Sequence, residues 1–180
     1  MPGAARDRLA AMAVLITGAA GSGTSTLARA LADRRGTVRV EADDIYWYAT
    51  VPPFTTKRPA AERQLLMAAR LRADPNAVVA GSVMGWGDEI ENAFAAIVFV
   101  YVDRRTRLAR LRQREQARYG RVNRAFLAWA ARYDAGTAPG RSLSRHRAWL
   151  AARTCPVVEL SGAMRVAEQC ETLARYAALR

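Results

Sequence analysis

A short apolar run that ends in a glycine-rich turn is the feature that most constrains the fold of this 180-residue chain. Residues 14–17 read Val-Leu-Ile-Thr, which is typical of a buried strand. Three glycines follow within Gly18–Thr26, and a helical pattern over 25–35 stops at Gly36, a favourable residue for ending a helix. A buried strand joined to a helix by so tight a turn indicates an α/β fold.

The rest of the chain repeats this alternation of strand and helix. A short strand is expected over 37–40, strands that are apolar on both faces over 77–80 and 97–102, and a fifth strand over 156–160. The proline-interrupted residues 46–53 are expected to form a loop. Helices are expected over 59–73, 104–119, 123–133, 143–153 and 164–179. The alternation predicts a three-layer α/β sandwich around a five-stranded parallel sheet.

Length and composition indicate one domain with a sizeable core, because 51% of the residues are hydrophobic. Residues 1–11 lack the apolar segment of a signal peptide, so we expect a flexible tail followed by a single domain over 12–180. No apolar stretch approaches the roughly 20 residues of a membrane-spanning helix. Two cysteines and one histidine exclude a disulfide framework and a zinc cluster, and we expect a cytoplasmic protein.

The glycine-rich turn has the pattern of a phosphate-binding loop, or P-loop. Glycines allow backbone N–H groups to point inward around phosphate oxygens, and the following helix directs its N-terminal amides at the same anion. Ser25 occupies the position from which a P-loop hydroxyl binds Mg²⁺. The residues expected to bind a nucleotide are Gly18, Gly21, Ser22, Gly23, Thr24, Ser25 and Thr26.

Thr24 stands where the P-loop pattern has a lysine. That lysine supplies positive charge to the β- and γ-phosphates, and the only lysine of this chain, Lys57, lies in a different loop. Two interpretations follow. Either the protein binds a nucleotide with little or no phosphoryl transfer, or arginines supply the missing charge. We favour the second, because suitably spaced arginines follow the predicted fourth strand.

The helix expected over 104–119 carries Arg107, Arg110, Arg114 and Arg118 at spacings of 3, 4 and 4. At ~100° per residue these arginines share one stripe of the helix. Glu115 is the only acidic residue on that helix, so local ion pairs cannot neutralise the stripe. Guanidinium groups bind phosphate oxygens in bidentate geometry, and we predict that Arg110 and Arg114 stabilise a transferred phosphoryl group. The alternative is a solvated basic face.

The net charge of +12 is concentrated in one region, since residues 104–147 hold 13 arginines against Glu115 and Asp134. Such a cluster suits either a nucleic acid or a small polyphosphate. No aromatic-rich sheet face or recognition-helix motif accompanies the arginines. A nucleic-acid-associated protein is therefore the third and least favoured interpretation.

Three carboxylates, Glu41, Asp43 and Asp44, follow the second predicted strand. The carboxyl ends of parallel strands form the ligand-binding edge of an open sheet, so these groups are expected near the P-loop. A carboxylate there can accept a proton from the acceptor or bind the waters of a metal ion. Asp43 alternates with Glu41 along an extended chain, so Asp43 ranks first, with Asp44 beside it. Ser25 and Asp43 are the predicted metal-binding residues.

Basic and aromatic side chains next to this edge form a predicted substrate-binding segment. Arg58 and Arg63 flank the start of the helix at Pro59, and Trp47 precedes the proline-rich loop. An indole ring there can stack on a planar base, or it can pack in the core. Asp88, which follows a Gly-Trp-Gly segment, is a further candidate on the metal side.

Together these residues resemble the nucleoside-monophosphate kinase branch of the P-loop kinases, which includes adenylate, cytidylate and shikimate kinases. The resemblance runs from Met12 over nearly the whole chain, and it rests on Gly18–Thr26, the three carboxylates, the Arg110–Arg114 segment and Ser161-Gly162. It implies strand order 2-3-1-4-5, and a last loop that approaches the adenine of ATP. It also implies ATP and Mg²⁺ as cofactors and transfer of the γ-phosphate to a small, nucleotide-like acceptor. The zinc-bearing lid of some members has no counterpart here, and threonine in place of the lysine is similar to a variant of cytidylate-kinase-like proteins.

Overall fold

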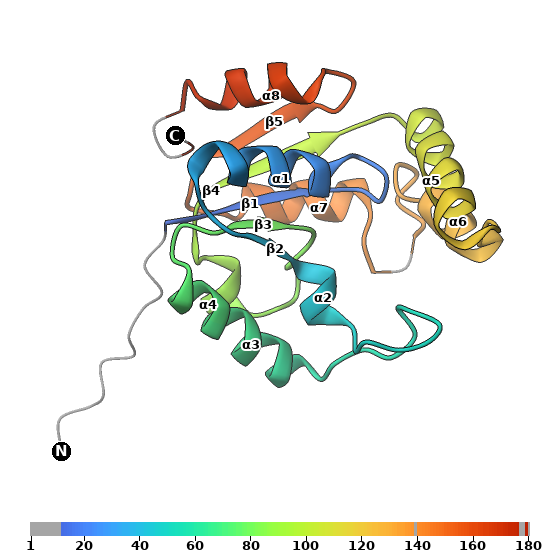
Figure 1. Ribbon diagram of the computed structural model, residues 1–180, viewed down its shortest axis with the longest axis horizontal. Coiled ribbons are helices and arrows are strands. Elements are labelled where there is room, and N and C mark those ends of the chain that lie inside the picture. The colour runs from blue at the N-terminus through green and yellow to red at the C-terminus, as the bar shows by residue number, and fades with distance from the viewer. Residues whose placement is uncertain (1–11, 139, 177–178, 180) are drawn as a thin grey trace, which may run out of the picture.

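Five parallel strands form the centre of the structure, a computed structural model that describes residues 12–138, 140–176 and 179 (Figure 1). The strands are β1 (Ala13–Gly18), β2 (Arg39–Glu41), β3 (Val78–Ala80), β4 (Phe94–Tyr101) and β5 (Val157–Ser161). Their order is β2-β3-β1-β4-β5, and every neighbouring pair is parallel. The predicted sheet and its strand order are confirmed. The expected tail, residues 1–11, lies outside the described residues.

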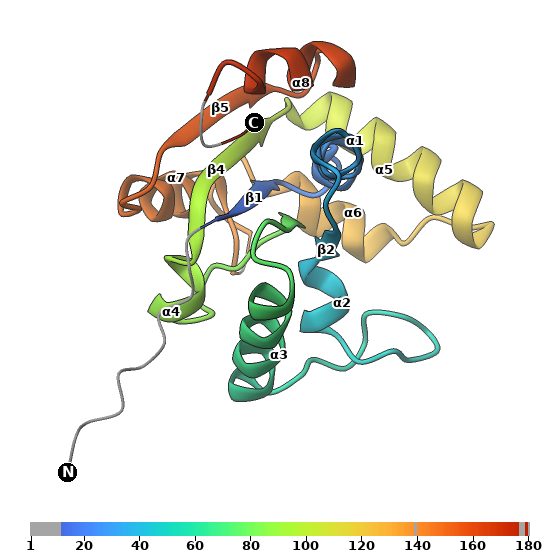
Figure 2. The same ribbon diagram turned by 60° about the vertical axis from the view of Figure 1, so that its left-hand side comes forward.

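Helices cover both faces of the sheet, which explains why the central strands β1, β3 and β4 are apolar on both sides. The edge strands β2 and β5 expose alternate residues. Leu15 and Val79 point to one face, where they pack with residues of α3 (Ala60–Ala73) and α7 (Leu143–Ala151). Val14 and Ile16 point to the other face, which α1 (Thr24–Arg35) and α8 (Val166–Leu173) cover (Figure 2). The result is a three-layer α/β sandwich.

Two further helices extend beyond the carboxyl edge of the sheet. Helix α5 (Arg104–Tyr119) has the bounds expected from the sequence, because Asp103 caps its N-terminus by accepting from the Thr106 amide at 2.9 Å and Gly120 ends it. Helix α6 (Arg124–Ala131) follows, and Asn123 caps it in the same way. Figure 1 shows both helices on the side toward which the β1 and β4 strands run.

Two short helices, α2 (Ala42–Tyr46) and α4 (Asp88–Glu91), were not expected from the sequence. Helix α2 begins directly after β2, so the inference that Asp43 alternates with Glu41 along a strand is wrong. Acidic residues in the first turn of each helix favour the helical conformation, because they interact with its positive N-terminal end. Helix α8 ends at Leu173, earlier than its apolar pattern suggested.

None of the helices in the described part of the chain is both long enough and apolar enough to span a bilayer.

Candidate functional site

The loop between β1 and α1 has the backbone of a phosphate cradle. Gly21 adopts a positive φ of 84°, and a Cβ at this position would lie 2.8 Å from the Arg107 carbonyl oxygen. A Cβ at Gly18 would lie 2.5 Å from both the Ser22 hydroxyl and the Val100 carbonyl oxygen. No side chain caps the N-terminus of α1, so its first amides are available to an anion. This geometry fits the phosphates of a nucleotide.

Ser25 and Glu41 meet at the carboxyl edge of the sheet. The Ser25 hydroxyl donates to Glu41 Oε2 at 3.0 Å, and Arg39 donates to Glu41 Oε1 at 2.6 Å. Burial raises the pKa of the Glu41 carboxyl, and the hydrogen bond from Ser25 and the charge of Arg39 partly oppose that shift. The sequence placed Glu41 in the acidic cluster but favoured Asp43 as the partner of Ser25. Because β2 ends at Glu41, this carboxylate is the one that touches the hydroxyl.

Asp43 and Asp44 lie in the first turn of α2, next to the Ser25–Glu41 pair. The pKa of Asp43 is raised, mainly because surrounding protein displaces water, and the like charge of Asp44 adds to the increase. Arg141 and Arg114 face the Asp43 carboxyl and lower its pKa. A carboxylate with a raised pKa is a better proton acceptor, so Asp43 has the electrostatic environment of a general base.

The arginine stripe of α5 divides into side chains with different surroundings. Arg107 is fully buried, and its guanidinium pairs with Asp134 and donates to the carbonyl oxygens of Val102 and Ala20. Ala20 belongs to the P-loop, so Arg107 supports the loop from behind. Arg118 stacks on Tyr119 at the far end of the helix, with 5.3 Å from its guanidinium carbon to the ring centroid.

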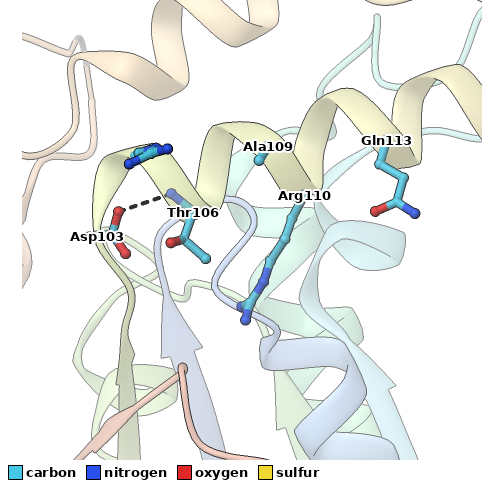
Figure 3. A pocket seen from close by; sticks show the side chains of 6 residues that line it. Asp103, Thr106, Ala109, Arg110 and Gln113 are labelled. Carbon is cyan, nitrogen blue, oxygen red and sulfur yellow. Dashed lines mark hydrogen bonds between the residues drawn. The ribbon is translucent and has the colours of Figure 1, made fainter.

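Arg110 and Arg114, the two predicted catalytic arginines, point toward the site. Arg110 extends from α5 toward the loop that leads into α1, and it donates to the Gly162 carbonyl oxygen at 2.9 Å (Figure 3). It also lines a pocket of about 510 Å³ with Asp103, Arg105, Thr106, Ala109 and Gln113. The Arg114 side chain is 55% exposed, with its nearest carboxylate oxygen, that of Glu115, at 4.0 Å. The structure therefore brings Arg110 to the P-loop and to the loop after β5, and Arg114 to face Asp43.

Aromatic rings and cations form a wall beside α2. The Arg63 guanidinium carbon lies 4.4 Å from the Tyr46 ring centroid and 5.5 Å from that of Trp86, and its buried Nε has no hydrogen-bond partner. Trp47 packs edge-on against Tyr46 at 4.9 Å, so at least part of its ring is used in packing. Arg63 is the predicted substrate-binding residue with the most available donors.

Arg58, the other predicted substrate-binding arginine, already interacts with Glu62 of α3 and with Tyr48. It donates to Glu62 at 2.7 Å and lies 4.4 Å above the Tyr48 ring, while the Tyr48 hydroxyl donates to Glu62 at 2.6 Å. These contacts order the segment that leads into α3. Asp88 begins α4, directly after the Gly-Trp-Gly turn.

A buried chain of polar groups, which the sequence did not reveal, lies under the site. His146 is hydrogen-bonded to the Thr17 hydroxyl at 3.0 Å and to the Tyr133 hydroxyl at 2.9 Å. Burial and the charge of Arg141 lower the pKa of His146 to about 3, so the ring is neutral. His146 also packs edge-on against Phe99 of β4, with 5.0 Å between the ring centroids. No sequence motif marked its hydrogen bonds or the approach of Arg141.

Among the described residues, no three His, Cys, Asp or Glu side chains gather as a metal cluster. Mg²⁺ at kinase sites is bound through one or two protein oxygens together with substrate phosphates and water. The oxygens of Ser25, Glu41 and Asp43 fit that smaller donor set.

Several known proteins resemble this chain in fold. A gluconokinase from Sinorhizobium meliloti shares 17% identity at a TM-score of 0.51, over 91% of this chain and 88% of that protein. A sugar kinase from Janibacter shares 15% identity at a TM-score of 0.54, over 93% and 96% of the two chains. These similarities confirm the P-loop kinase fold.

Sequence comparison identifies a relative and a family in addition to the fold. The chain is 34% identical over 171 residues to YqaC of Bacillus subtilis, described as an uncharacterized protein, with 89% of this chain and 94% of that protein covered. The sequence model of the AAA domain family (AAA_18) matches residues 14–125, which include the P-loop, the acidic cluster and all of α5. The chain therefore belongs to the AAA domain family of proteins with a P-loop.

Proposed function

We propose that this protein is an ATP- and Mg²⁺-dependent kinase that transfers the γ-phosphate to a small acceptor. The observation that carries the proposal is the Ser25–Glu41 hydrogen bond at the mouth of the P-loop. It places a hydroxyl and a carboxylate together where a phosphate-bound metal ion would lie. Mg²⁺ bound by Ser25 and Glu41, with Asp43 nearby, would neutralise charge on the β- and γ-phosphates.

Other residues of the chain are proposed to bind the donor, stabilise the transferred group and accept the proton. Amides of Gly18–Thr26 hold the donor phosphates, and Arg110 and Arg114 stabilise charge on the transferred group. Asp43 accepts the proton of the acceptor. The bond from γ-phosphorus to the bridging oxygen breaks with its electrons left on ADP, while the acceptor oxygen bonds to that phosphorus. The pocket beside Arg110, next to the Gly162 loop, is where we place the donor base.

The acceptor is proposed to bind against Arg63 and Tyr46. A guanidinium between two rings favours an acceptor that carries an anionic group. The motif resemblance supports a nucleotide-like acceptor, as in the nucleoside-monophosphate kinases, with threonine in place of the lysine. The two fold relatives described as gluconokinase and sugar kinase support a hydroxylated acceptor instead.

The experiment is ADP formation from ATP and Mg²⁺ with a panel of nucleoside monophosphates, nucleosides and sugar acids. We expect acceptor-dependent ADP formation that Ser25→Ala reduces by about two orders of magnitude. The matched control is Ser144→Ala, at an exposed serine of α7 outside the site. ADP formation at background with every acceptor would contradict a kinase.

A second candidate is a nucleotide-binding regulator without phosphoryl transfer, favoured by Thr24 at the lysine position. This candidate predicts saturable ATP binding with no turnover in the wild type. The variant Thr24→Lys separates the two, because turnover that appears only in the variant would show a loop that binds nucleotide but lacks the catalytic charge.

A further inference from the structure

Glu91, the last residue of α4, is a buried carboxylate that binds a loop through one oxygen and α7 through the other. Its Oε1 accepts from the backbone amides of Gly85 at 2.7 Å and Trp86 at 3.0 Å. Its Oε2 accepts from the indole N–H of Trp149, and Arg153 pairs with the same oxygen at 3.4 Å. Glu91 therefore joins the loop that follows β3 to the C-terminal end of α7.

The loop that Glu91 holds borders the proposed kinase site. Strand β3 lies between β1, which leads into the P-loop, and β2, which ends at Glu41. Directly after β3, the Gly81 amide donates to the Ile16 carbonyl oxygen of β1 at 3.0 Å, and a Cβ at Gly81 would lie 3.0 Å from that of Ala42 in α2. Ligands of open parallel sheets bind outside the carboxyl ends of the strands, which is where this loop begins.

The Trp86 ring connects this loop to the residues proposed to bind the acceptor. The ring is buried and stacks on Tyr46, with 6.1 Å between the centroids and 28° between the planes. The Arg63 guanidinium carbon lies 4.4 Å from the Tyr46 centroid and 5.5 Å from that of Trp86. Gly87 has a φ of 92°, and a Cβ there would lie 2.8 Å from Nε2 of Gln64 in α3, which lies beside α4 (Figure 1). A shift of the Trp86 backbone would therefore move the ring against which Tyr46 and Arg63 pack.

A carboxylate suits this position because its two oxygens accept from donors on opposite sides. Replacing it would leave the buried loop amides or the Trp149 indole without an acceptor, and a buried donor without a partner is costly. The ion pair with Arg153, whose guanidinium carbon lies 4.9 Å from the Trp149 ring centroid, offsets part of the cost of burying the charge. The contacts on both sides fix where Glu91 holds the loop.

We propose that Glu91 is a positioning residue for the acceptor, which it serves by fixing the loop amides and, through them, the Trp86 ring. This inference rests on the proposed kinase activity. Glu91 acts through Trp86 on Tyr46 and Arg63, and it contacts neither substrate. Loss of its carboxylate should therefore weaken acceptor binding and leave nucleotide binding at the P-loop unchanged.

The kinetics of Glu91→Met test the proposal, since methionine fills a similar volume without carboxylate oxygens. The assay uses the acceptor that gives the most ADP formation in the panel described above. We expect the KM for the acceptor to rise at least about tenfold, with kcat and the KM for ATP within about twofold of the wild type. An unchanged acceptor KM would overturn the inference. An equal rise in both KM values would also overturn it, because a general loss of structure would explain that result.

Two control variants separate positioning from stability. Trp149→Phe removes a donor to Oε2 and keeps the bonds from Oε1 to the loop, so it should lower Tm and leave the acceptor KM within about twofold. Glu89→Gln, at an exposed residue of the same helix that pairs with Arg72 at 3.4 Å, should change neither. If Trp149→Phe raises the acceptor KM as much as Glu91→Met does, the loop bonds are not the cause and the inference is wrong.

Hydrogen exchange measured by NMR examines the loop without an acceptor. The amides of Gly85 and Trp86 should exchange at least about tenfold faster in Glu91→Met, while the buried amide of Leu27 in α1 keeps its wild-type rate. Equal protection of the two loop amides in both proteins would contradict the inference. If Glu91→Met is unfolded by circular dichroism, Glu91→Gln replaces it in the same comparisons, because its single carbonyl oxygen cannot serve both sets of donors.

Failure of this inference is distinguishable from failure of the kinase proposal. A wild type that forms no ADP with any acceptor contradicts the kinase, and the acceptor role of Glu91 with it. An active wild type whose acceptor KM is unchanged in the Glu91 variant contradicts the role of Glu91 alone.

Discussion

Glu41 is the residue whose role the structure changes most, because its carboxylate, and not that of Asp43, accepts the Ser25 hydrogen bond. We predict that Glu41→Gln raises the Mg²⁺ concentration for half-maximal activity by about tenfold, since a neutral amide is a weaker ligand for a hard cation. A titration of activity with Mg²⁺ measures this. Glu159→Gln, at an exposed residue of β5, is the matched control. An unchanged Mg²⁺ requirement would remove Glu41 from the metal site.

His146 predicts how stability depends on pH. Its pKa is about 3 in the folded protein and near 6.5 when exposed, so below pH 6.5 the unfolded chain binds a proton that the folded one does not. The free energy of unfolding should therefore fall with acidification, by about 2 kcal/mol between pH 7 and pH 5 from this residue. Urea denaturation at both pH values compares the wild type with His146→Gln. If the variant loses as much stability as the wild type, the low pKa is wrong.

At the residue scale, the sequence identified residues whose roles depend on the local backbone. It missed residues whose roles depend on contacts with segments far away in the chain. Gly18 and Gly21 were identifiable because only glycine tolerates their close contacts, and Ser25 because its place in the loop is fixed. Arg141 was not identifiable, since its approach to Asp43 depends on how the segment before α7 packs. The catalytic roles of Asp43, Asp44, Arg110 and Arg114 stay predictions.

At the scale of elements, α5 combines structural and proposed catalytic arginines one turn apart. Arg107 is buried and paired with Asp134, so Arg107→Met should lower the free energy of unfolding by about 3 kcal/mol, because Asp134 and three carbonyl groups lose the Arg107 donor. Arg118→Met, at the exposed end, should change it by less than ~0.5 kcal/mol. Urea denaturation measures both. Equal stabilities would show that Arg107 is not a structural contact.

Arg114 is expected to show the opposite behaviour. Its largely exposed side chain faces Asp43, so Arg114→Ala should leave stability within ~0.5 kcal/mol and reduce turnover by about two orders of magnitude. Arg118→Ala, one turn further along the helix, is the control for turnover. A rate within about twofold of the wild type would mean that Arg114 belongs to a solvated basic face.

Long helices with clear capping residues were predicted more accurately than short ones. Helix α5 was predicted to the residue, because Asp103 and Gly120 mark its ends. Helix α2 was missed, since five residues give no apolar period and β2 ends without a glycine or proline. That error had a functional consequence, because it led to the wrong reason for ranking Asp43 above Glu41.

At the scale of the whole molecule, the distribution of the positive charge indicates whether the protein binds a small polyphosphate or a nucleic acid. Of the 13 arginines in residues 104–147, Arg107, Arg110, Arg145 and Arg147 donate to protein oxygens. Arg110 also lies beside the P-loop, and Arg114 and Arg141 act on the Asp43 carboxyl. Convergence on one site favours a compact anion over an extended backbone.

Thermal stability measured with each ligand distinguishes a small polyphosphate from a nucleic acid, because a ligand that binds the folded state raises Tm. ATP with Mg²⁺ at about 100 times its Kd should stabilise the fold by about 2.7 kcal/mol and raise Tm by roughly 5–10 °C in a chain of this size. A nucleic acid that contacts many phosphates would lose about 10³-fold or more in affinity between roughly 50 and 200 mM salt. We therefore expect the Tm increase with ATP to persist at the higher salt concentration, and short oligonucleotides to leave both Tm and gel mobility unchanged. An oligonucleotide that raises Tm more than ATP does, with steep salt dependence, would make the arginines of α5 and α6 a nucleic-acid surface and leave the P-loop without its proposed phosphate ligand.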